Sequence, residues 1–321
     1  MLVPQRFNTE VDEDGALYMY AEGDNSFPPA AKMPAGGFYF DSLKRQPPFE
    51  EENLRLEDNL EEFGPISDED LKHLNTESLH IFEQTDRAIM LVFPGAGFGD
   101  IALVPGPMLK NPKGIRDIEE WYISTVSRQD FIYQIFNRQC DIAMQNLPKV
   151  YEAVGNRITA VWLSGTDFGA QHGSFISPKS FQKLYKPHYK RINDWIHANT
   201  KWKVFIHCCG SIMSLIPEFI ESGFDILNPV QTSAKNMDPH ELKARFGSRL
   251  TFWGGGVDTQ QVLPFGTPED VRAQVRERLC VFGTGGGFVF NPIHNVQAGV
   301  QSENLLAMYE TVRDYGKYPL S

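Results

Sequence analysis

The chain has 321 residues, of which 41% are hydrophobic and 22% charged, and its net charge is −11 at pH 7. This composition is typical of a globular protein with a large core, arranged as one barrel-sized domain or two smaller ones. No apolar run is long enough to span a bilayer, the first fifteen residues do not resemble a signal peptide, and four cysteines do not make a disulfide framework. Without a basic cluster, the sequence also excludes a nucleic-acid-binding protein, so we expect a cytoplasmic protein with neither a nucleic-acid nor a membrane partner.

The negative charge is concentrated near the N-terminus. Residues 1–70 hold 17 acidic and 5 basic residues, whereas the remainder holds 24 and 25. We therefore predict an acidic extension over residues 1–70, followed by the main domain over residues 71–321. Within the extension, residues 15–20 are predicted to form one arm of a hairpin and residues 37–41 the other. A helix is predicted from Ser67, which is followed by acidic residues that suit a helix start, to about Gln84.

Short apolar segments then alternate with helical segments. The six segments predicted as strands are residues 88–93, 158–163, 204–206, 225–228, 250–253 and 288–291. Helices are predicted over residues 129–154, 177–199 with a bend at Pro187, 211–223, 239–246, 267–282 and 302–315. This alternation predicts an α/β fold with parallel strands, either a doubly wound sheet or a (β/α)8 barrel. We favour the barrel, because polar residues follow every strand and no G-x-G-x-x-G motif opens a helix.

The segment after the third predicted strand carries His207, Cys208 and Cys209. Since side chains alternate along a strand, His207 and Cys209 point the same way and Cys208 points to the other face. An imidazole beside a thiol supplies half of a zinc site, and His294, after the last strand, is the candidate for the third ligand. The alternative for the His–Cys pair is a small-residue turn with a structural histidine. Cys208 and Cys280 are expected to pack in the core.

Further polar side chains follow the strands and are expected at the same barrel mouth: Asp167, Gln171, Gln231, Asp258, Gln260 and Asn295. Asp167 is a candidate for proton transfer, with a role as a loop acid as the alternative. The other five are candidates for substrate binding, with structural or surface roles as alternatives. These strand-end segments contain no arginine and a single lysine, Lys235, which argues against a polycarboxylate substrate held by guanidinium groups.

The strand ends also form a set of motifs in a fixed order. They are GTDFGAQ (165–171) with ISP (176–178), HCCGS (207–211), NPVQ (228–231), WGGGVDTQ (253–260), PFGTP (264–268) and GFVFNPIHN (287–295). As a set, these motifs resemble the uroporphyrinogen decarboxylase superfamily over roughly residues 80–318. The resemblance is closest to the branch of cobalamin-dependent methyltransferases that contains methylcobalamin:coenzyme M methyltransferase.

The resemblance to the methyltransferase branch implies a (β/α)8 barrel with a zinc site. In that branch a His-x-Cys and a later ligand, usually cysteine, hold the metal, and the corresponding positions here are His207, Cys209 and, in place of the cysteine, His294. The implied reaction moves a methyl group between a corrinoid, free or carried by a small corrinoid protein, and a thiol or folate acceptor. Run in reverse, the same reaction is a demethylation.

Two other functions stay open. The decarboxylase branch of the superfamily implies cofactor-free decarboxylation of a tetrapyrrole, in which His294 or Asp167 would be the catalytic residue that handles protons. That branch holds the tetrapyrrole with an arginine-rich segment and an aspartate on the first two strands, which we do not find here. A non-catalytic barrel that binds a corrinoid or porphyrin is the other possibility. Because six strands are predicted instead of eight, we expect the first two barrel strands to be missing from this sequence or replaced by the N-terminal extension.

Overall fold

The computed structural model describes residues 8–320. Residues 1–7 and Ser321 lie outside the described residues, and residues 1–7 belong to the stretch in which no signal peptide is expected. The chain divides into two compact units, one formed by Met1–Arg87 and Val92–Arg157 and the other by Ala88–Leu91 and Ile158–Ser321. The domain boundary predicted near residue 70 stays a prediction. Within residues 8–320, no helix is both long and apolar enough to cross a membrane.

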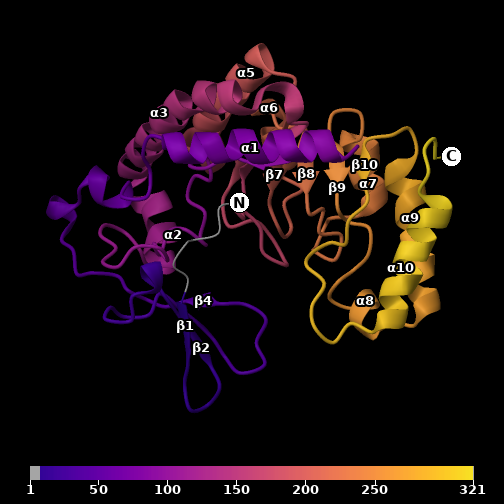
Figure 1. Cartoon of the computed structure of the whole chain (residues 1–321), viewed down its shortest axis with the longest axis horizontal. Helices are drawn as coiled ribbons and strands as arrows, with labels where there is room; N and C mark the ends of the chain where they lie inside the picture. The colour runs from indigo at the N-terminus through magenta and orange to yellow at the C-terminus, as the bar shows by residue number, and fades with distance from the viewer. Residues whose placement is uncertain (1–7, 321) are drawn as a thin grey trace. The chain divides into compact units, whose positions relative to one another are not determined.

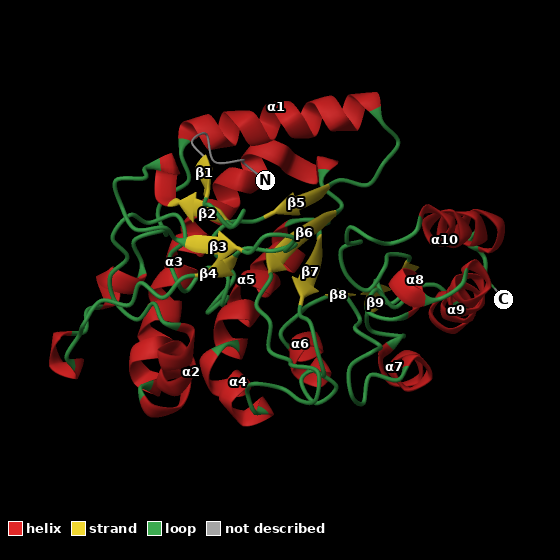
Figure 2. Cartoon of the chain, turned by 90° about the horizontal axis from the view of Figure 1, so that it is seen from below, coloured by secondary structure: helices red, strands yellow, loops and turns green. Residues whose placement is uncertain are grey.

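The first unit contains a small antiparallel sheet with strand order β1-β2-β3-β4. Strands β1, β2 and β4 are labelled in Figure 1, and β3 is labelled with them in Figure 2. Its elements are β1 (Asn8–Val11), β2 (Leu17–Tyr20), η1 (Ala21–Gly23), β3 (Ala31–Met33), β4 (Asp41–Ser42), η2 (Glu51–Asn53), η3 (Leu56–Asn59), α1 (Asp68–Gln84), α2 (Ile118–Ser127), α3 (Gln129–Val154) and η4 (Gly155–Arg157). The predicted hairpin partner was wrong: β2 pairs with β1 and β3, not with residues 37–41. The reason is a turn after β3, in which the carbonyl of Pro34 accepts the N–H of Gly37.

Helix α1 begins where the sequence predicts, because the hydroxyl of Ser67 accepts the N–H of Asp70 at 3.0 Å. It packs against α3, which carries the largest apolar face of this unit. A cavity of about 30 Å³, lined in part by Trp121 and Gln139, lies in the same unit. Since about 10–15 Å³ of such volume holds one water, this cavity is too small for an organic substrate.

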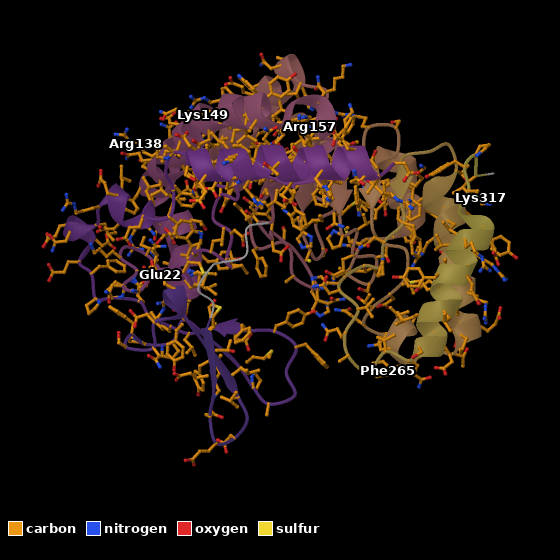
Figure 3. All side chains as sticks on the ribbon, in the orientation of Figure 1. Glu22, Arg138, Lys149, Arg157, Phe265 and Lys317 are labelled. Atoms are coloured by element: carbon orange, nitrogen blue, oxygen red, sulfur yellow. The ribbon has the colours of Figure 1, made fainter. Side chains whose placement is uncertain are left out.

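The surface of the first unit carries ion pairs. Glu22, labelled in Figure 3, forms one with Lys110 at 3.1 Å.

The second unit is built on a six-stranded sheet with order β10-β9-β8-β7-β6-β5, in which β6 to β10 pair in parallel. Strands β5 to β9 are labelled in Figure 2, and β7 to β10 in Figure 1. Its elements are β5 (Met90–Val92), β6 (Ala160–Ser164), α4 (Pro178–Leu184), α5 (Lys186–Asn199), β7 (Lys203–His207), α6 (Ile216–Glu221), β8 (Ile226–Asn228), α7 (Pro239–Phe246), β9 (Thr251–Trp253), α8 (Val262–Phe265), α9 (Pro268–Gly283), β10 (Phe288–Val289) and α10 (Ser302–Tyr315). The predicted α/β fold with alternating parallel strands and helices is confirmed. In this linear order β5 and β10 are the two edges, so closure into a (β/α)8 barrel stays a prediction.

The two faces of this sheet differ in how completely they are buried. One face presents side chains that are at most 1% exposed: Val161, Leu163, Val204, Ile206, Leu227 and Phe252. Helices pack on this face, and Phe252 meets Phe282 of α9 with ring centroids 5.1 Å apart. The opposite face carries a cluster of Ala160, Phe205 and Ile226, with Met90, Trp162 and Trp253 only partly buried against it. Burial on both faces explains the continuous apolar strands seen in the sequence.

Three local predictions need correction or refinement. The predicted bend near Pro187 is a break, with α4 ending before Tyr185 and α5 beginning after it. Helix α6 begins at Ile216 and not at Ser211, because the N–H of Ser211 donates to the carbonyl of Ala170 and its hydroxyl to that of Lys235. Cys208 is buried as expected, but Cys280 is exposed on α9 and does not pack in the core.

Candidate metal centre

The loops that follow β6, β7 and β8 are joined by hydrogen bonds around Cys209 and Gly210. The N–H of Cys209 donates to Oδ1 of Asp167 at 2.6 Å, and the N–H of Gly210 donates to Oε1 of Gln231 at 2.8 Å. Gly210 has φ +88°, and a Cβ at this position would lie 2.4 Å from the carbonyl carbon of Gly169. The loop after β7 therefore requires glycine here, both for its backbone conformation and for its close contact with the loop after β6.

His207, Cys209 and His294 come together at the carboxyl ends of the strands. Sγ of Cys209 lies 3.3 Å from Nε2 of His207, and one ligand atom from each of the three residues lies within 4.8 Å of the others. For bonds of about 2.0 Å to nitrogen and 2.3 Å to sulfur, a tetrahedral zinc site places neighbouring ligands about 3.5 Å apart. The His207–Cys209 pair matches that spacing, and His294 is the more distant member. These three residues are the ones that the sequence predicted to hold a metal.

The ring of His207 is held by residues of the neighbouring strands. Its Nδ1 lies 2.6 Å from Oδ1 of Asn228, which is opposite it in the β7–β8 register. Nδ2 of Asn228 donates to the carbonyl oxygen of Trp253 at 2.8 Å, which leaves the amide oxygen facing the ring. Trp162 stacks on the ring with centroids 5.5 Å apart and an interplanar angle of 17°. The plane of the imidazole and the direction of its Nε2 are thus both fixed.

The electrostatic surroundings favour neutral forms of Cys209 and His294. Burial raises the pKa of the Cys209 thiol well above its ordinary value, and the Asp167 carboxylate raises it further. Burial lowers the pKa of His294, and the facing His207 adds to this effect, while Asp167 opposes it. At pH 7 and without a bound cation, the Cys209 thiol therefore keeps its proton and the His294 imidazole is neutral. A thiol must lose that proton to bind a metal, so metal binding here is coupled to proton release.

An apolar surface lies on the same sheet face as His207. Phe205, two residues earlier on β7, is 1% exposed. The centroid of its ring lies 5.0 Å from that of Trp162 and 5.5 Å from that of Trp253. Met90 also packs against this cluster. These side chains make the sheet face next to His207 largely apolar and aromatic.

The other predicted site residues lie on the same set of loops, and most bond to neighbouring protein groups. Nε2 of Gln231 donates to Oε1 of Gln171 at 3.1 Å, and Nε2 of Gln171 donates to the carbonyl of Ser233 at 2.6 Å. The hydroxyl of Ser233 in turn donates to Oε1 of Gln260 at 3.2 Å. These contacts form an amide chain beside Gly210. Direct contact of these amides with a substrate stays a prediction.

Asp258 and Asn295 lie outside that amide chain. Oδ1 of Asp258 accepts the N–H groups of Gln260 and Gln261 at 2.7 and 3.3 Å, and so shapes the turn before α8. Asn295 is exposed on the loop after β10, next to His294. The predicted roles of both in substrate binding stay predictions.

Two residues that contact the site were missed from the sequence, Asn228 and Trp162. Both belong to strands, where they were interpreted as parts of apolar strand segments. Their contacts with His207 depend on the register between β6, β7 and β8, which pairs Trp162 with Phe205 and Asn228 with His207. The available signals for Asn228 were its position as the last residue of its strand and its place at the start of the NPVQ motif (228–231).

Comparison with known proteins places the chain in a family. Residues 113–315 match the model of the uroporphyrinogen decarboxylase (URO-D) family. The chain belongs to this family. A uroporphyrinogen decarboxylase from Methylococcus capsulatus is 30% identical over 95 residues, which cover 30% of this chain and 25% of that protein. A methylated-thiol–coenzyme M methyltransferase from Methanosarcina mazei is 25% identical over 148 residues, which cover 44% of this chain and 38% of that protein.

A solved structure supports the fold. A methyltransferase from Methanosarcina mazei superposes with a TM-score of 0.53 at 15% identity, covering 77% of this chain and 64% of that one. The chain thus spans between a quarter and about two thirds of the length of the relatives it matches. The expected resemblance to a family with methyltransferase members is confirmed. Since both a decarboxylase and a methyltransferase are among the relatives, family membership alone does not select the reaction.

Proposed function

We propose that this protein is a zinc-dependent methyltransferase that moves a methyl group between a corrinoid and a thiol or folate, in either direction. The observation that carries the proposal is the convergence of His207, Cys209 and His294, whose ligand atoms lie within 4.8 Å of one another. Thiolate and imidazole are ligands that zinc prefers, and three protein ligands leave a fourth position open for a substrate. The residues therefore fit a catalytic zinc site.

Zinc bound by these three residues would lower the pKa of an acceptor thiol and so supply a thiolate at neutral pH. In the overall reaction, the acceptor sulfur loses its proton and forms a bond to the methyl carbon. The bond between that carbon and the corrinoid breaks, and its electron pair stays with the corrinoid. The methyl carrier is proposed to be free methylcobalamin or the corrinoid of a small partner protein. The protein is proposed to act in the cytoplasm.

Asp167 is the proposed proton acceptor for the thiol. Its Oδ1 lies 3.9 Å from Nε2 of His207 and accepts the N–H of Cys209, so the carboxylate is held beside the predicted ligands. A carboxylate at this distance can take the acceptor proton directly or through one water. His294, whose pKa is lowered by burial and by His207, is neutral at pH 7 and available as a ligand or as a second proton acceptor.

The amide chain of Gln171, Gln231 and Gln260, together with Asp258 and Asn295, is proposed to face the substrate. Gln171 and Gln260 are exposed, so each presents part of its amide to solvent although it bonds to a neighbour. Lys235 is the one cationic side chain of the strand-end segments. A polycarboxylate tetrapyrrole needs several cations, so this composition favours methyl transfer over decarboxylation.

The proposal is tested by an anaerobic methyl-transfer assay with zinc-loaded protein, methylcobalamin, and either a small thiol or tetrahydrofolate. We expect demethylation of the corrinoid with one of the two acceptors and its loss in Cys209→Ser. Cys280→Ser, which removes an exposed cysteine on α9, should retain the rate of the unaltered protein. Release of carbon dioxide from uroporphyrinogen would contradict the proposal and support decarboxylation. Folded protein that binds a corrinoid but turns over neither substrate would support a binding function.

A further inference from the structure

The contact between Asn228 and His207 determines which ring nitrogen of His207 carries hydrogen. Asn228 is buried at the end of β8, and its Nδ2 donates to the carbonyl of Trp253 at 2.8 Å. Because that end of the amide is the donor, the atom that lies 2.6 Å from Nδ1 of His207 is an oxygen and can only accept. Nδ1 must therefore donate a hydrogen.

A hydrogen on Nδ1 of His207 determines the state of Nε2, at the opposite edge of the ring. In a neutral imidazole with hydrogen on Nδ1, the lone pair is on Nε2. Nε2 lies 3.3 Å from Sγ of Cys209 and 3.9 Å from Oδ1 of Asp167, on the side where His294 approaches. The free tautomer of histidine generally carries its hydrogen on Nε2, which would instead point an N–H toward the other ligands.

We propose that Asn228 is the positioning residue of the site: it selects the Nδ1–H tautomer of His207 and so presents the Nε2 lone pair to the metal. Trp162 has the complementary role of fixing the ring plane by stacking. Hydrogen bonds of this kind orient metal ligands in proteins, and their removal commonly weakens metal binding by about 10- to 100-fold. The inference rests on the proposed function for the identity of the metal, but not for the tautomer.

The tautomer is measured by 15N-correlated NMR of the ring of His207 in metal-free protein at a pH where the ring is neutral. We expect the Nδ1–H form in the unaltered protein and a shift toward the Nε2–H form in Asn228→Ala. The control is Asn193→Ala, because Asn193 is buried in the same unit and donates to the carbonyl of Ser222 in the same manner, far from His207 in its contacts. An unchanged tautomer in Asn228→Ala would overturn the proposal.

Titration with Co²⁺, followed by its visible absorption, provides the second readout. We expect Asn228→Ala to weaken Co²⁺ binding by about 10- to 100-fold and Asn193→Ala to leave it unchanged. Asn228→Asp keeps an acceptor toward Nδ1 but loses the donor to Trp253, and should retain both the tautomer and affinity within a few-fold of the original. If Asn228→Asp binds Co²⁺ as weakly as Asn228→Ala, the bond to Trp253 matters and the tautomer does not, which overturns the proposal. If the unaltered protein binds no metal, the proposed function fails while the NMR result still decides the role of Asn228.

Discussion

Sγ of Cys209 lies 3.3 Å from Nε2 of His207, although the two residues are separated only by Cys208. Cys208 turns to the other side, where its Sγ accepts the N–H of Phe168 at 3.2 Å. The end of β7 thus presents two ligands on one side and anchors the neighbouring loop on the other. This arrangement depends on the backbone that follows, and above all on Gly210.

Replacement of Gly210 by alanine is expected to destabilise the protein and to displace Cys209. The left-handed backbone alone costs a non-glycine residue about 1–2 kcal/mol. A Cβ here would also lie 2.4 Å from Gly169 and force the two loops apart, which adds about 1–3 kcal/mol. Gly285→Ala is the matched control, because Gly285 has φ +76° with nothing within 4 Å of its added Cβ. Urea unfolding should show a larger loss for Gly210→Ala, and equal losses in the two variants would refute the packing argument.

Replacement of Asp167 by asparagine should make the thiol of Cys209 more reactive in metal-free protein. Burial is the main reason that the pKa of Cys209 is raised, and the charge of Asp167 adds to it. Asparagine removes the charge, so the pKa falls and more thiolate is present at any given pH. The rate of alkylation by iodoacetamide, measured for the Cys209 peptide by mass spectrometry near pH 8, should increase in Asp167→Asn. The rate at the exposed Cys280 should not change. A slower rate at Cys209 in the variant would contradict this account.

Asp225 is expected to stabilise the fold in a pH-dependent way. Burial by itself would raise the pKa of its carboxyl, but hydrogen bonds from His197 and from the N–H of Val204, both 2.8 Å long, lower that pKa below its ordinary value overall. The folded state therefore stabilises the ionised form of the Asp225 carboxyl more than the unfolded chain does. This stability is fully present above the unfolded pKa of about 3.9 and is lost as the pH falls through the lower folded value.

The corresponding measurement is urea unfolding of Asp225→Asn at about pH 7 and again at about pH 3. We expect a loss of about 1–2 kcal/mol at the higher pH, because hydrogen bonds to a partly buried charge are replaced by weaker ones, and a smaller difference at the lower pH. Asp194→Asn is the control, since Asp194 forms an exposed pair with Lys190 on α5. Its loss should stay below about 0.5 kcal/mol. A difference for Asp225→Asn that grows as the pH falls would contradict the assignment.

The sequence predicted the strands of the second unit well, because strands buried on both faces leave continuous apolar runs that end in glycine, proline or polar residues. It also predicted that His207, Cys209 and His294 would meet, since the ends of parallel strands share one edge of a sheet. It did not predict the contact between His207 and Asn228, because that contact depends on interstrand register, which local pattern does not encode. The exposure of Cys280 was missed for a related reason: a helical face among apolar neighbours is buried only where a partner covers it.

The metal content of the purified protein tests the central claim most directly. We predict about one zinc per chain, reduced to a small fraction in Cys209→Ser and in His294→Ala, and unchanged in Cys280→Ser, with all variants folded by circular dichroism. A protein that is folded, contains no zinc and takes up none on dialysis against it would contradict the claim. Zinc that persists in Cys209→Ser would do the same, because it would place the metal elsewhere.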